Sequence, residues 1–377
     1  MKRYRFTYFS IAILIFAMLA FTGCGGGTET TQGTPEELPT VKVAYVHVDH
    51  QSPLFVAGKL GEEFKASGTY LNPIIDKEEY ELISDGKKVA LVELVATKSG
   101  SEAATLFAQN HIDMALFSIT AAMAAVDSGT PIKILGPIHT EGLGLVFPAG
   151  SNIKGWDEFL TYVKEQDEPV KIGYHSPTSA PKIVFEGALH REGISYTADV
   201  NDLSADILMV DLKSTSNLIS AMNSGQVDGW VGPSPHPQVA ETTGAGEIVL
   251  DLRDLPPAGH WHDFPCCIVA ATDSLLESNV EVAEAFMKLM TDSAHYCNEH
   301  REVLAQVNAE WIGIPQDAAE KSTVVYTTNP NENWVNGAGI YLEVLNDMGN
   351  FKGSFQDKEL EDVHDMLFNF EVVKKFN

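Results

Sequence analysis

The sequence predicts an α/β protein built as two similar lobes. One segment occurs twice, at residues 103–135 and 218–250, and the copies stay 115 residues apart (Asp228 minus Asp113). Each copy alternates the signals of helix, strand, helix and strand. The length of 377 residues is also more than one ordinary hydrophobic core supports. Two equivalent units therefore favour two α/β lobes, whose ligands sit where strands end and helices begin.

Turn residues and acidic residues mark the same places in both copies. The first helix stops at Asn110 in one copy and at Gly225 in the other, and both residue types readily take positive φ. An apolar residue and an aspartate follow, Asp113 or Asp228, and then a short apolar strand. A loop of small polar residues after that strand opens the next helix.

The other elements follow from the same kinds of pattern. A strand at 41–48 leads into a helix that Ser52 caps and in which Pro53 takes the first position. Residues 70–88 are rich in charges and turn formers and predict a surface hairpin. Further strands are expected at 89–97, 171–174, 207–211 and 265–271. Further helices are expected at 152–165, 180–192, 280–298, 301–309, 315–326 and 360–370.

The N-terminus has the features of an export signal. Three basic residues precede an apolar stretch at 11–21, which has the length of a signal peptide rather than of a membrane span. The stretch runs into Phe-Thr-Gly-Cys and three glycines, which resembles the lipobox of bacterial lipoproteins. We expect residues 1–23 to be removed, Cys24 to carry lipid and residues 24–40 to form a flexible tether. A plain secretory signal with an incidental cysteine is the alternative.

The chain is strongly acidic, which restricts its partners. Its formal net charge is −27, whereas nucleic-acid binding needs a basic face, so we expect no nucleic-acid partner. Only three arginines follow the predicted signal: Arg191, Arg253 and Arg301. Planar oxyanions such as sulfonate or nitrate are commonly held by a guanidinium group. The scarcity of arginine favours a neutral, zwitterionic or metal-containing solute.

Four segments carry a resemblance to a known family. They are residues 41–61, 110–136, 171–194 and 223–240. Together they resemble the nitrate/sulfonate/taurine-type solute-binding proteins of ABC importers, a group that includes relatives of thiamine-precursor-binding proteins. The resemblance covers roughly residues 41–290. Residues 70–88 and 261–267 depart from the pattern of that family.

The resemblance implies an architecture and a set of partners. The fold would be the type II periplasmic-binding-protein fold, with each lobe a mixed sheet flanked by helices and with hinge strands between them. We expect one lobe at 41–142 and 265–377 and the other at 143–264. The partners would be a small-molecule solute, the permease subunits and, through the lipid on Cys24, a membrane. We expect a monomer on the outside of the bacterial cell membrane, with no cofactor.

Helix N-termini suit polar solutes because they present unpaired N–H groups and the positive end of the helix dipole. We therefore expect four strand-end loops to converge on a cleft between the lobes, with a hinge histidine in its wall. The ligand-binding candidates are His50, Gln51, Ser52, Ser118, Thr120, His139, Ser176, Thr178, Ser179, Pro233, Ser234, His236, Cys266 and Cys267. For each serine and threonine, an ordinary helix cap is the competing interpretation.

Adjacent cysteines suggest an alternative ligand. Cys266 and Cys267 follow His262, and thiolate and imidazole are ligands of soft or borderline metals. A soft-metal or organometal receptor that uses these residues and the cleft histidines is therefore a second hypothesis. Strand alternation would place the two sulfurs on opposite faces, so only one need face the cleft. A vicinal disulfide, or two small buried residues on a strand, would explain the same pair.

An enzyme is the third hypothesis. Cys266 or Cys267 would be the nucleophile, with His262 or His236 as its base. The sequence contains no GxSxG, HExxH or GxxxxGK[ST] motif, so a binding protein is the preferred interpretation and we expect no catalytic residue.

Overall fold

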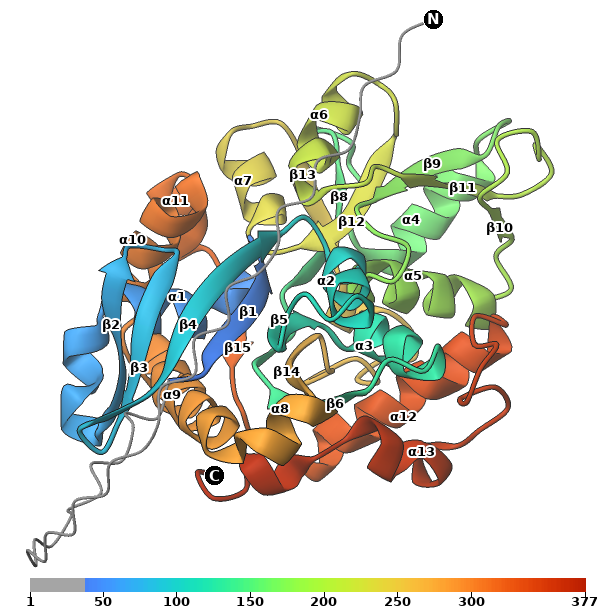
Figure 1. Cartoon of the computed structure of the whole chain (residues 1–377). Helices are drawn as coiled ribbons and strands as arrows, with labels where there is room; N and C mark the ends of the chain where they lie inside the picture. Colours follow the sequence, from blue (N-terminus) through green and yellow to red (C-terminus); the bar gives the residue numbers. More distant parts are fainter. Residues whose placement is uncertain (1–37) are drawn as a thin grey trace, which may run out of the picture. The chain divides into compact units, whose positions relative to one another are not determined.

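Two mixed sheets organise the part of the chain that the structure describes, residues 38–377 of a computed structural model (Figure 1). The predicted signal peptide, Cys24 and nearly all of the tether lie outside these residues. None of the described helices is long and apolar enough to cross a bilayer.

The first sheet has seven strands and the second has six. The first sheet runs in the order β2 (Thr69–Ile75), β3 (Glu79–Ser84), β4 (Lys87–Thr97), β1 (Thr40–Val46), β5 (Met114–Ser118), β14 (Cys267–Thr272) and β6 (Ile132–Pro137). The second sheet runs in the order β10 (Tyr196–Thr197), β11 (Ile207–Asp211), β9 (Val170–Tyr174), β12 (Gly229–Pro233), β8 (Leu143–Phe147) and β13 (Glu247–Asp251). A short ladder pairs β7 (His139–Thr140) with β15 (Val325–Tyr326).

Thirteen α-helices surround the sheets within the described residues. They are α1 (Ser52–Lys59), α2 (Gly100–Ala108), α3 (Ile119–Asp127), α4 (Gly155–Lys164), α5 (Ala180–Arg191), α6 (Leu218–Asn223), α7 (His236–Thr242), α8 (Asp273–Ser278), α9 (Val280–Glu299), α10 (Arg301–Asn308), α11 (Gln316–Glu320), α12 (Glu332–Asp347) and α13 (Leu360–Leu367). Because helices cover both faces of the first sheet, the central strand β5 is buried at every position and is apolar nearly throughout.

The predicted duplication is present in the sheet order. The run β4-β1-β5-β14-β6 corresponds strand by strand to β11-β9-β12-β8-β13. In both runs the first three strands are parallel and the last two are antiparallel to their neighbours. β8 and β14 therefore occupy equivalent places, and each lies between the two strands of its repeat copy.

The equivalent turn and aspartate residues make equivalent structures. Asn110 has φ 55° and Gly225 has φ 71°, as their positions at the ends of α2 and α6 require. The Asp113 carboxylate accepts from the Lys42 N–H at 2.8 Å. The Asp228 carboxylate accepts from the Lys171 N–H at the same distance. Each aspartate thus joins the strand that follows its helix to the neighbouring parallel strand, β1 in one half and β9 in the other.

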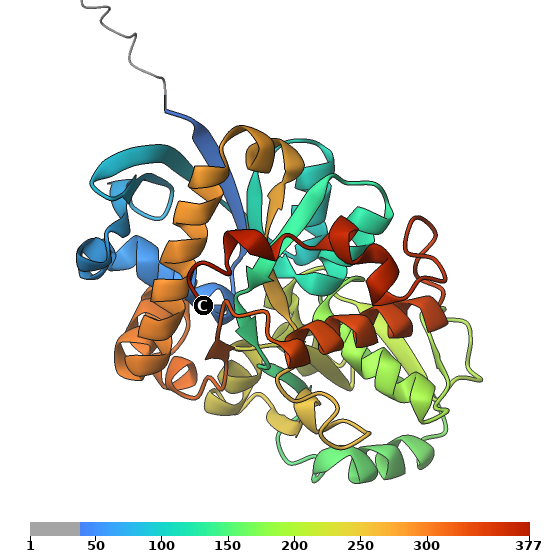
Figure 2. The same cartoon turned by 90° about the horizontal axis from the view of Figure 1, so that it is seen from below.

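The C-terminal segment packs across both halves. Helix α12, which the sequence patterns did not predict, contacts α5 beside the second sheet and α3 beside the first. In the view from below, the orange-red helix α12 lies beside the green helix α5 (Figure 2). A Cβ on Gly337 would lie 2.4 Å from Pro265, so a glycine is needed where α12 crosses the segment before β14. This packing requirement overrides the weak helix propensity of glycine.

Some expected boundaries were wrong. The helix after the first strand was expected to be capped by Ser52 and to end near Gly68. Instead α1 begins at Ser52 and ends at Lys59, and a separate 3-10 helix spans Gly61–Ser67. The expected helix at 315–326 is the short α11, because Val325–Tyr326 pairs instead with β7. The strand expected at 265–271 begins only at Cys267.

Candidate ligand-binding site

The ends of four strands surround one small cavity, called the loop cavity below. Its volume is about 30 Å³, close to the space that one water molecule takes in the liquid. The lining residues are Val46, Val48, His50, Gln51, Gly100, Ser118, His175, Ser179, Ala180, Pro181, Pro233, Cys266 and Cys267. Each of the four loops that the sequence predicted to converge contributes at least one of them. Both sheets therefore contribute to the cavity.

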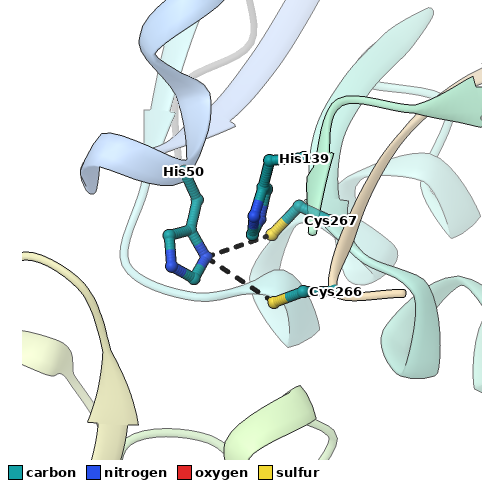
Figure 3. Close-up of side chains that lie close together, drawn as sticks. All are labelled: His50, His139, Cys266 and Cys267. Atoms are coloured by element: carbon teal, nitrogen blue, oxygen red, sulfur yellow. Dashed lines mark hydrogen bonds between the residues drawn. The ribbon is translucent and has the colours of Figure 1, made fainter. Parts of the chain in front are cut away.

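A compact group of two histidines and two cysteines forms part of this region. One nitrogen or sulfur atom from each of His50, His139, Cys266 and Cys267 lies within 4.8 Å of all the others, and all four residues are buried. His50 precedes α1, His139 belongs to β7, and the cysteines lie at the start of β14. Figure 3 shows both sulfurs beside the His50 ring, with His139 close behind them. We call these four residues the Cys₂His₂ cluster.

Hydrogen bonding orients the His50 ring toward the sulfurs. His50 Nε2 lies 3.1 Å from the Gly142 carbonyl, which can only accept, so we assign the proton to Nε2. Nδ1 then presents its lone pair to Cys266 Sγ at 3.6 Å and Cys267 Sγ at 3.8 Å. A Cβ on Gly142 would lie 3.0 Å from Nε2, and its φ is 77°, so glycine permits this approach.

The same reasoning applies to His139. Its Nδ1 lies 3.2 Å from the Thr140 carbonyl and donates to it. Its Nε2 is buried and has no hydrogen-bond partner among the described residues. The two imidazole rings pack with their centroids 4.0 Å apart. Burial lowers the pKa of both rings, that of His139 to about 4, so both are neutral at pH 7.

The two cysteines differ in acidity. Burial raises the pKa of Cys266 well above its ordinary value, and the neighbouring Cys267 raises it further. Burial also opposes ionisation of Cys267, but its contacts with the Cys266 thiol, the His50 ring and the Gln51 amide outweigh burial and lower that pKa to about 6. The Gln51 side-chain amide also donates to Cys267 Sγ at 3.6 Å. The pair therefore holds one readily formed thiolate.

The expectation that the two sulfurs face opposite ways was wrong. Cys266 lies outside β14, which begins at Cys267, so the alternation of a regular strand does not apply to the pair. The Ile119 N–H donates to the Cys266 carbonyl and the Ile138 N–H donates to the Cys267 carbonyl. These bonds hold the backbone so that both sulfurs approach His50. Cys266, Cys267 and Cys297 are all free thiols, so the vicinal disulfide is not present.

Two more histidines are buried nearby. His175 lines the loop cavity, and its Nδ1 has no partner among the described residues. Nε2 of His236, at the start of α7, is also buried without a hydrogen-bond partner among the described residues. Burial lowers the pKa of His175 to about 3 and that of His236 to about 4, and His50 contributes to both shifts. His175 directly follows β9 and was not among the binding candidates predicted from the sequence.

Several predicted residues bond to protein groups away from the loop cavity. Ser52 Oγ donates to Asn308 at 2.8 Å and accepts from Tyr326, inside the first half. Thr120 Oγ1 donates to the Thr178 carbonyl at 2.7 Å. Thr120 and Thr178 also line a separate cavity of about 290 Å³.

Ser176 and Ser234 make contacts between the two halves of the fold. Ser176 Oγ lies 2.6 Å from Ser101 Oγ. Ser234 Oγ donates to Asp49 at 2.7 Å, and Ser322 Oγ donates to the same carboxylate oxygen at 2.7 Å. The sequence interpretation missed Asp49, although a carboxylate directly after a buried strand is a signal for such a role.

His262 is not part of the Cys₂His₂ cluster. Its side chain is 53% exposed, and its Nε2 lies 3.6 Å from Asp254. His50 takes the place beside the sulfurs that the metal and enzyme hypotheses gave to His262. Within residues 38–377, His236 likewise makes no hydrogen bond with either thiol.

Positive charge is absent from the loop cavity. Its lining, within the described residues, includes neither arginine nor lysine. Arg253 pairs with Glu141 at 2.7 Å and with Asp251 at 3.4 Å. A strong oxyanion would therefore find no guanidinium in this cavity.

The fold and the strand-end cavity define the class of two-lobed periplasmic-binding-protein structures. A ligand-binding component of an ABC-type import system from Staphylococcus aureus, solved with zinc bound, has a TM-score of 0.66 and 16% identity over 90% of this chain and 99% of its own. The nitrate-binding protein of Synechocystis PCC 6803 has a TM-score of 0.64 and 14% identity over 90% and 88%. The alkanesulfonate-binding protein of Xanthomonas axonopodis, bound to MOPS, has a TM-score of 0.63 and 12% identity over 88% and 99%.

Sequence comparison identifies the family. The model of the NMT1-like family matches residues 34–313, so the chain belongs to that family. An uncharacterized protein of Methanocaldococcus jannaschii is 37% identical over 141 residues, which are 37% of this chain and 93% of that protein.

Proposed function

We propose that this chain is the exported solute-binding component of an ABC importer, which captures a small solute between two lobes and delivers it to a permease. The observation that carries the proposal is the loop cavity, to which strand-end residues of both sheets contribute. Helix N-termini and buried polar groups at such a place suit the recognition of a small solute. The solved structures that share the fold support the same function, since one is named as the ligand-binding component of an ABC-type import system and the others as alkanesulfonate-binding and nitrate-binding proteins.

Hinge closure is the proposed mechanism of capture. Hydroxyl contacts join the two halves around the cavity, including Ser101 with Ser176 at 2.6 Å and with Thr178 at 2.8 Å. Each such contact contributes about 0.5–1.5 kcal/mol net, because water replaces it when the halves separate. A few contacts of this size leave open and closed states close in free energy, so the solute can shift the balance.

Export and anchoring complete the proposal. Lipid on Cys24 would hold the protein at the membrane, and residues 24–40 would let it reach the permease. We place the lobe boundaries near residues 142–143 and 264–265, where the chain passes from one sheet to the other. A low arginine content and a loop cavity whose described lining has neither arginine nor lysine support a solute other than a strong oxyanion.

A screen of solutes tests this function. Thermal unfolding and small-angle scattering of the full chain would be measured with nitrate, alkanesulfonates, neutral and zwitterionic metabolites, and metal ions. One class should raise the Tm and reduce the radius of gyration. Ser179→Phe fills the loop cavity and should abolish the response, whereas Ser220→Phe on exposed α6 should keep it. A library without any such response, or an unchanged response in Ser179→Phe, would contradict the proposal.

A further inference from the structure

We infer that the Cys₂His₂ cluster is a four-coordinate site for a thiophilic metal ion of the Zn²⁺ class, and that this ion is what the loop cavity recognises. The inference rests on the proposed function, because it names the ligand class of the same cavity. It begins with the donor atoms. Two sulfurs and two imidazole nitrogens are the ligand set that Zn²⁺ and softer ions prefer over oxygen-seeking ions such as Mg²⁺ or Ca²⁺.

The spacing of the donors is close to that of tetrahedral coordination. In a tetrahedral site with Zn–S of about 2.3 Å and Zn–N of about 2.0–2.1 Å, neighbouring sulfur and nitrogen ligands stand about 3.6 Å apart. His50 Nδ1 lies 3.6 Å from Cys266 Sγ and 3.8 Å from Cys267 Sγ. All four donors lie within 4.8 Å of one another. Small side-chain movements would bring them to tetrahedral distances.

The free lone pairs belong to the nitrogens that the metal needs. Metal-binding histidines usually donate their other ring N–H to a carbonyl or carboxylate, which fixes the tautomer. His50 does this with the Gly142 carbonyl and His139 with the Thr140 carbonyl. The remaining nitrogen of His139 is fully buried and has no hydrogen-bond partner within residues 38–377, which is costly for an ordinary core histidine. A ligand at this position would satisfy it.

Charge balance also favours a divalent ion. Two thiolates and two neutral imidazoles carry two negative charges, so bound Zn²⁺ would leave the buried group electrically neutral. A buried group of zero net charge avoids most of the desolvation penalty of an isolated ion. The Gln51 amide donates to Cys267 Sγ and would support that thiolate. The cavity volume of about 30 Å³ suits a single ion rather than a sulfonate of many atoms.

The position of the cluster connects metal binding with capture. His50, Cys266 and Cys267 line the same cavity as His175, Ser179 and Pro233 from the other half. A metal held by the first three therefore faces the second sheet across the cavity. Binding of the metal would therefore favour closure of the two halves.

Metal titration of the full chain tests the inference. The protein would be reduced, stripped of metal with a chelator and titrated with Zn²⁺ in the presence of a chromophoric competitor. We expect one Zn²⁺ per chain in the wild type. The double variant Cys266→Ser/Cys267→Ser should bind at least about 100-fold more weakly, since even second-shell changes cost up to that factor. Cys297→Ser, which also removes a buried thiol, should stay within about threefold of the wild type.

The absorption spectrum of Co²⁺ bound to the wild-type chain tests the site without relying on a variant that must fold. Co²⁺ added to the wild-type chain should produce thiolate charge-transfer absorption and the intense visible bands of tetrahedral coordination. His139→Ala should weaken these bands. Octahedral Co²⁺ spectra, or Zn²⁺ affinity in the double variant equal to that of the wild type, would overturn the inference.

Scattering separates this inference from the proposed function. Compaction by Zn²⁺ would support both. Compaction by another solute, with no stoichiometric Zn²⁺ binding, would overturn the metal site and leave the solute-binding function in place. Zn²⁺ binding without compaction by any solute would instead contradict the transport function and the role of the metal as its cargo.

Discussion

Asp49 is the residue at which burial and hydrogen bonding oppose each other most directly. It is fully buried, and burial raises the pKa of its carboxyl although Ser322 and Ser234 donate to it. Ser234 belongs to the second sheet's loop, so the carboxylate joins the two halves. Its role is therefore that of an acceptor for two hydroxyl groups.

Replacing Asp49 tests this role. Asp49→Ala should lower the free energy of unfolding by about 1–3 kcal/mol, because the buried Ser234 hydroxyl and the partly buried Ser322 hydroxyl lose their acceptor. Asp49→Asn keeps an acceptor oxygen of the same shape and should lose less than half as much. Urea unfolding monitored by fluorescence gives both values. Equal losses in the two variants would show that hydrogen bonding to Ser234 and Ser322 is not the cause.

Residue types alone identified many members of the site. His50 was a binding candidate from its strand-end loop, His139 as a hinge residue, and Cys266 and Cys267 as adjacent thiols. What could not be predicted was which histidine meets the sulfurs. His262 is only four residues from Cys266, yet His50, more than two hundred residues away, is the neighbour. Proximity in sequence says little about proximity across a sheet.

At the scale of elements, the duplication is the strongest feature of the chain. Each copy places an aspartate so that its carboxylate accepts an N–H near the start of a neighbouring parallel strand, from Lys42 of β1 or from Lys171 of β9. These contacts have the same geometry in both sheets and lie near the surface. The copies should therefore respond alike to the same change.

Parallel substitutions measure this equivalence. Asp113→Ala and Asp228→Ala should each lower the free energy of unfolding by about 1 kcal/mol, the usual net value of an accessible hydrogen bond. The two losses should agree within about 0.5 kcal/mol, and Asp76→Ala on the exposed hairpin should cost less than that. A large loss in only one copy, found by urea unfolding, would refute energetic equivalence.

Elements with strong local patterns were the ones that could be predicted. The repeated strands, the loops after them and the hairpin at β2 and β3 follow from alternation, apolar runs and turn formers. Helix α12 was missed because Gly337 and Gly339 weaken its local signal, while its packing against Pro265 is a property of the assembled fold. The start of β14 was misplaced because the hydrogen bonds of Cys266 come from distant segments.

At the scale of the whole molecule, buried neutral histidines couple stability to pH. Burial lowers the folded-state pKa of His175 and of His236 to about 3 and about 4, and each ring faces His50 and one or more other histidines. Between these values and the unfolded pKa of about 6.5, the unfolded state binds more protons. Stability is therefore fully present above about pH 6.5 and is lost as the pH falls.

The expected loss is large enough to measure. Each histidine should contribute about 2 kcal/mol to the fall in unfolding free energy between about pH 7 and pH 5. Urea unfolding of the chelator-treated chain at the two pH values gives the total. His175→Gln should reduce the fall by about its own share, whereas His111→Gln at an exposed position should not change it. An identical fall in wild type and His175→Gln would contradict the assignment.

The sequence by itself determined the duplicated α/β plan, the strand-end loops and the residue types gathered there, because hydrophobic period, turn formers and caps act over a few neighbouring residues. Only the tertiary structure decided that His50 and His139 meet both cysteines, that Asp49 joins the halves and that Arg253 is neutralised by its own carboxylates. Those outcomes depend on strand order and on backbone hydrogen bonds between segments far apart in the chain, which local patterns do not encode.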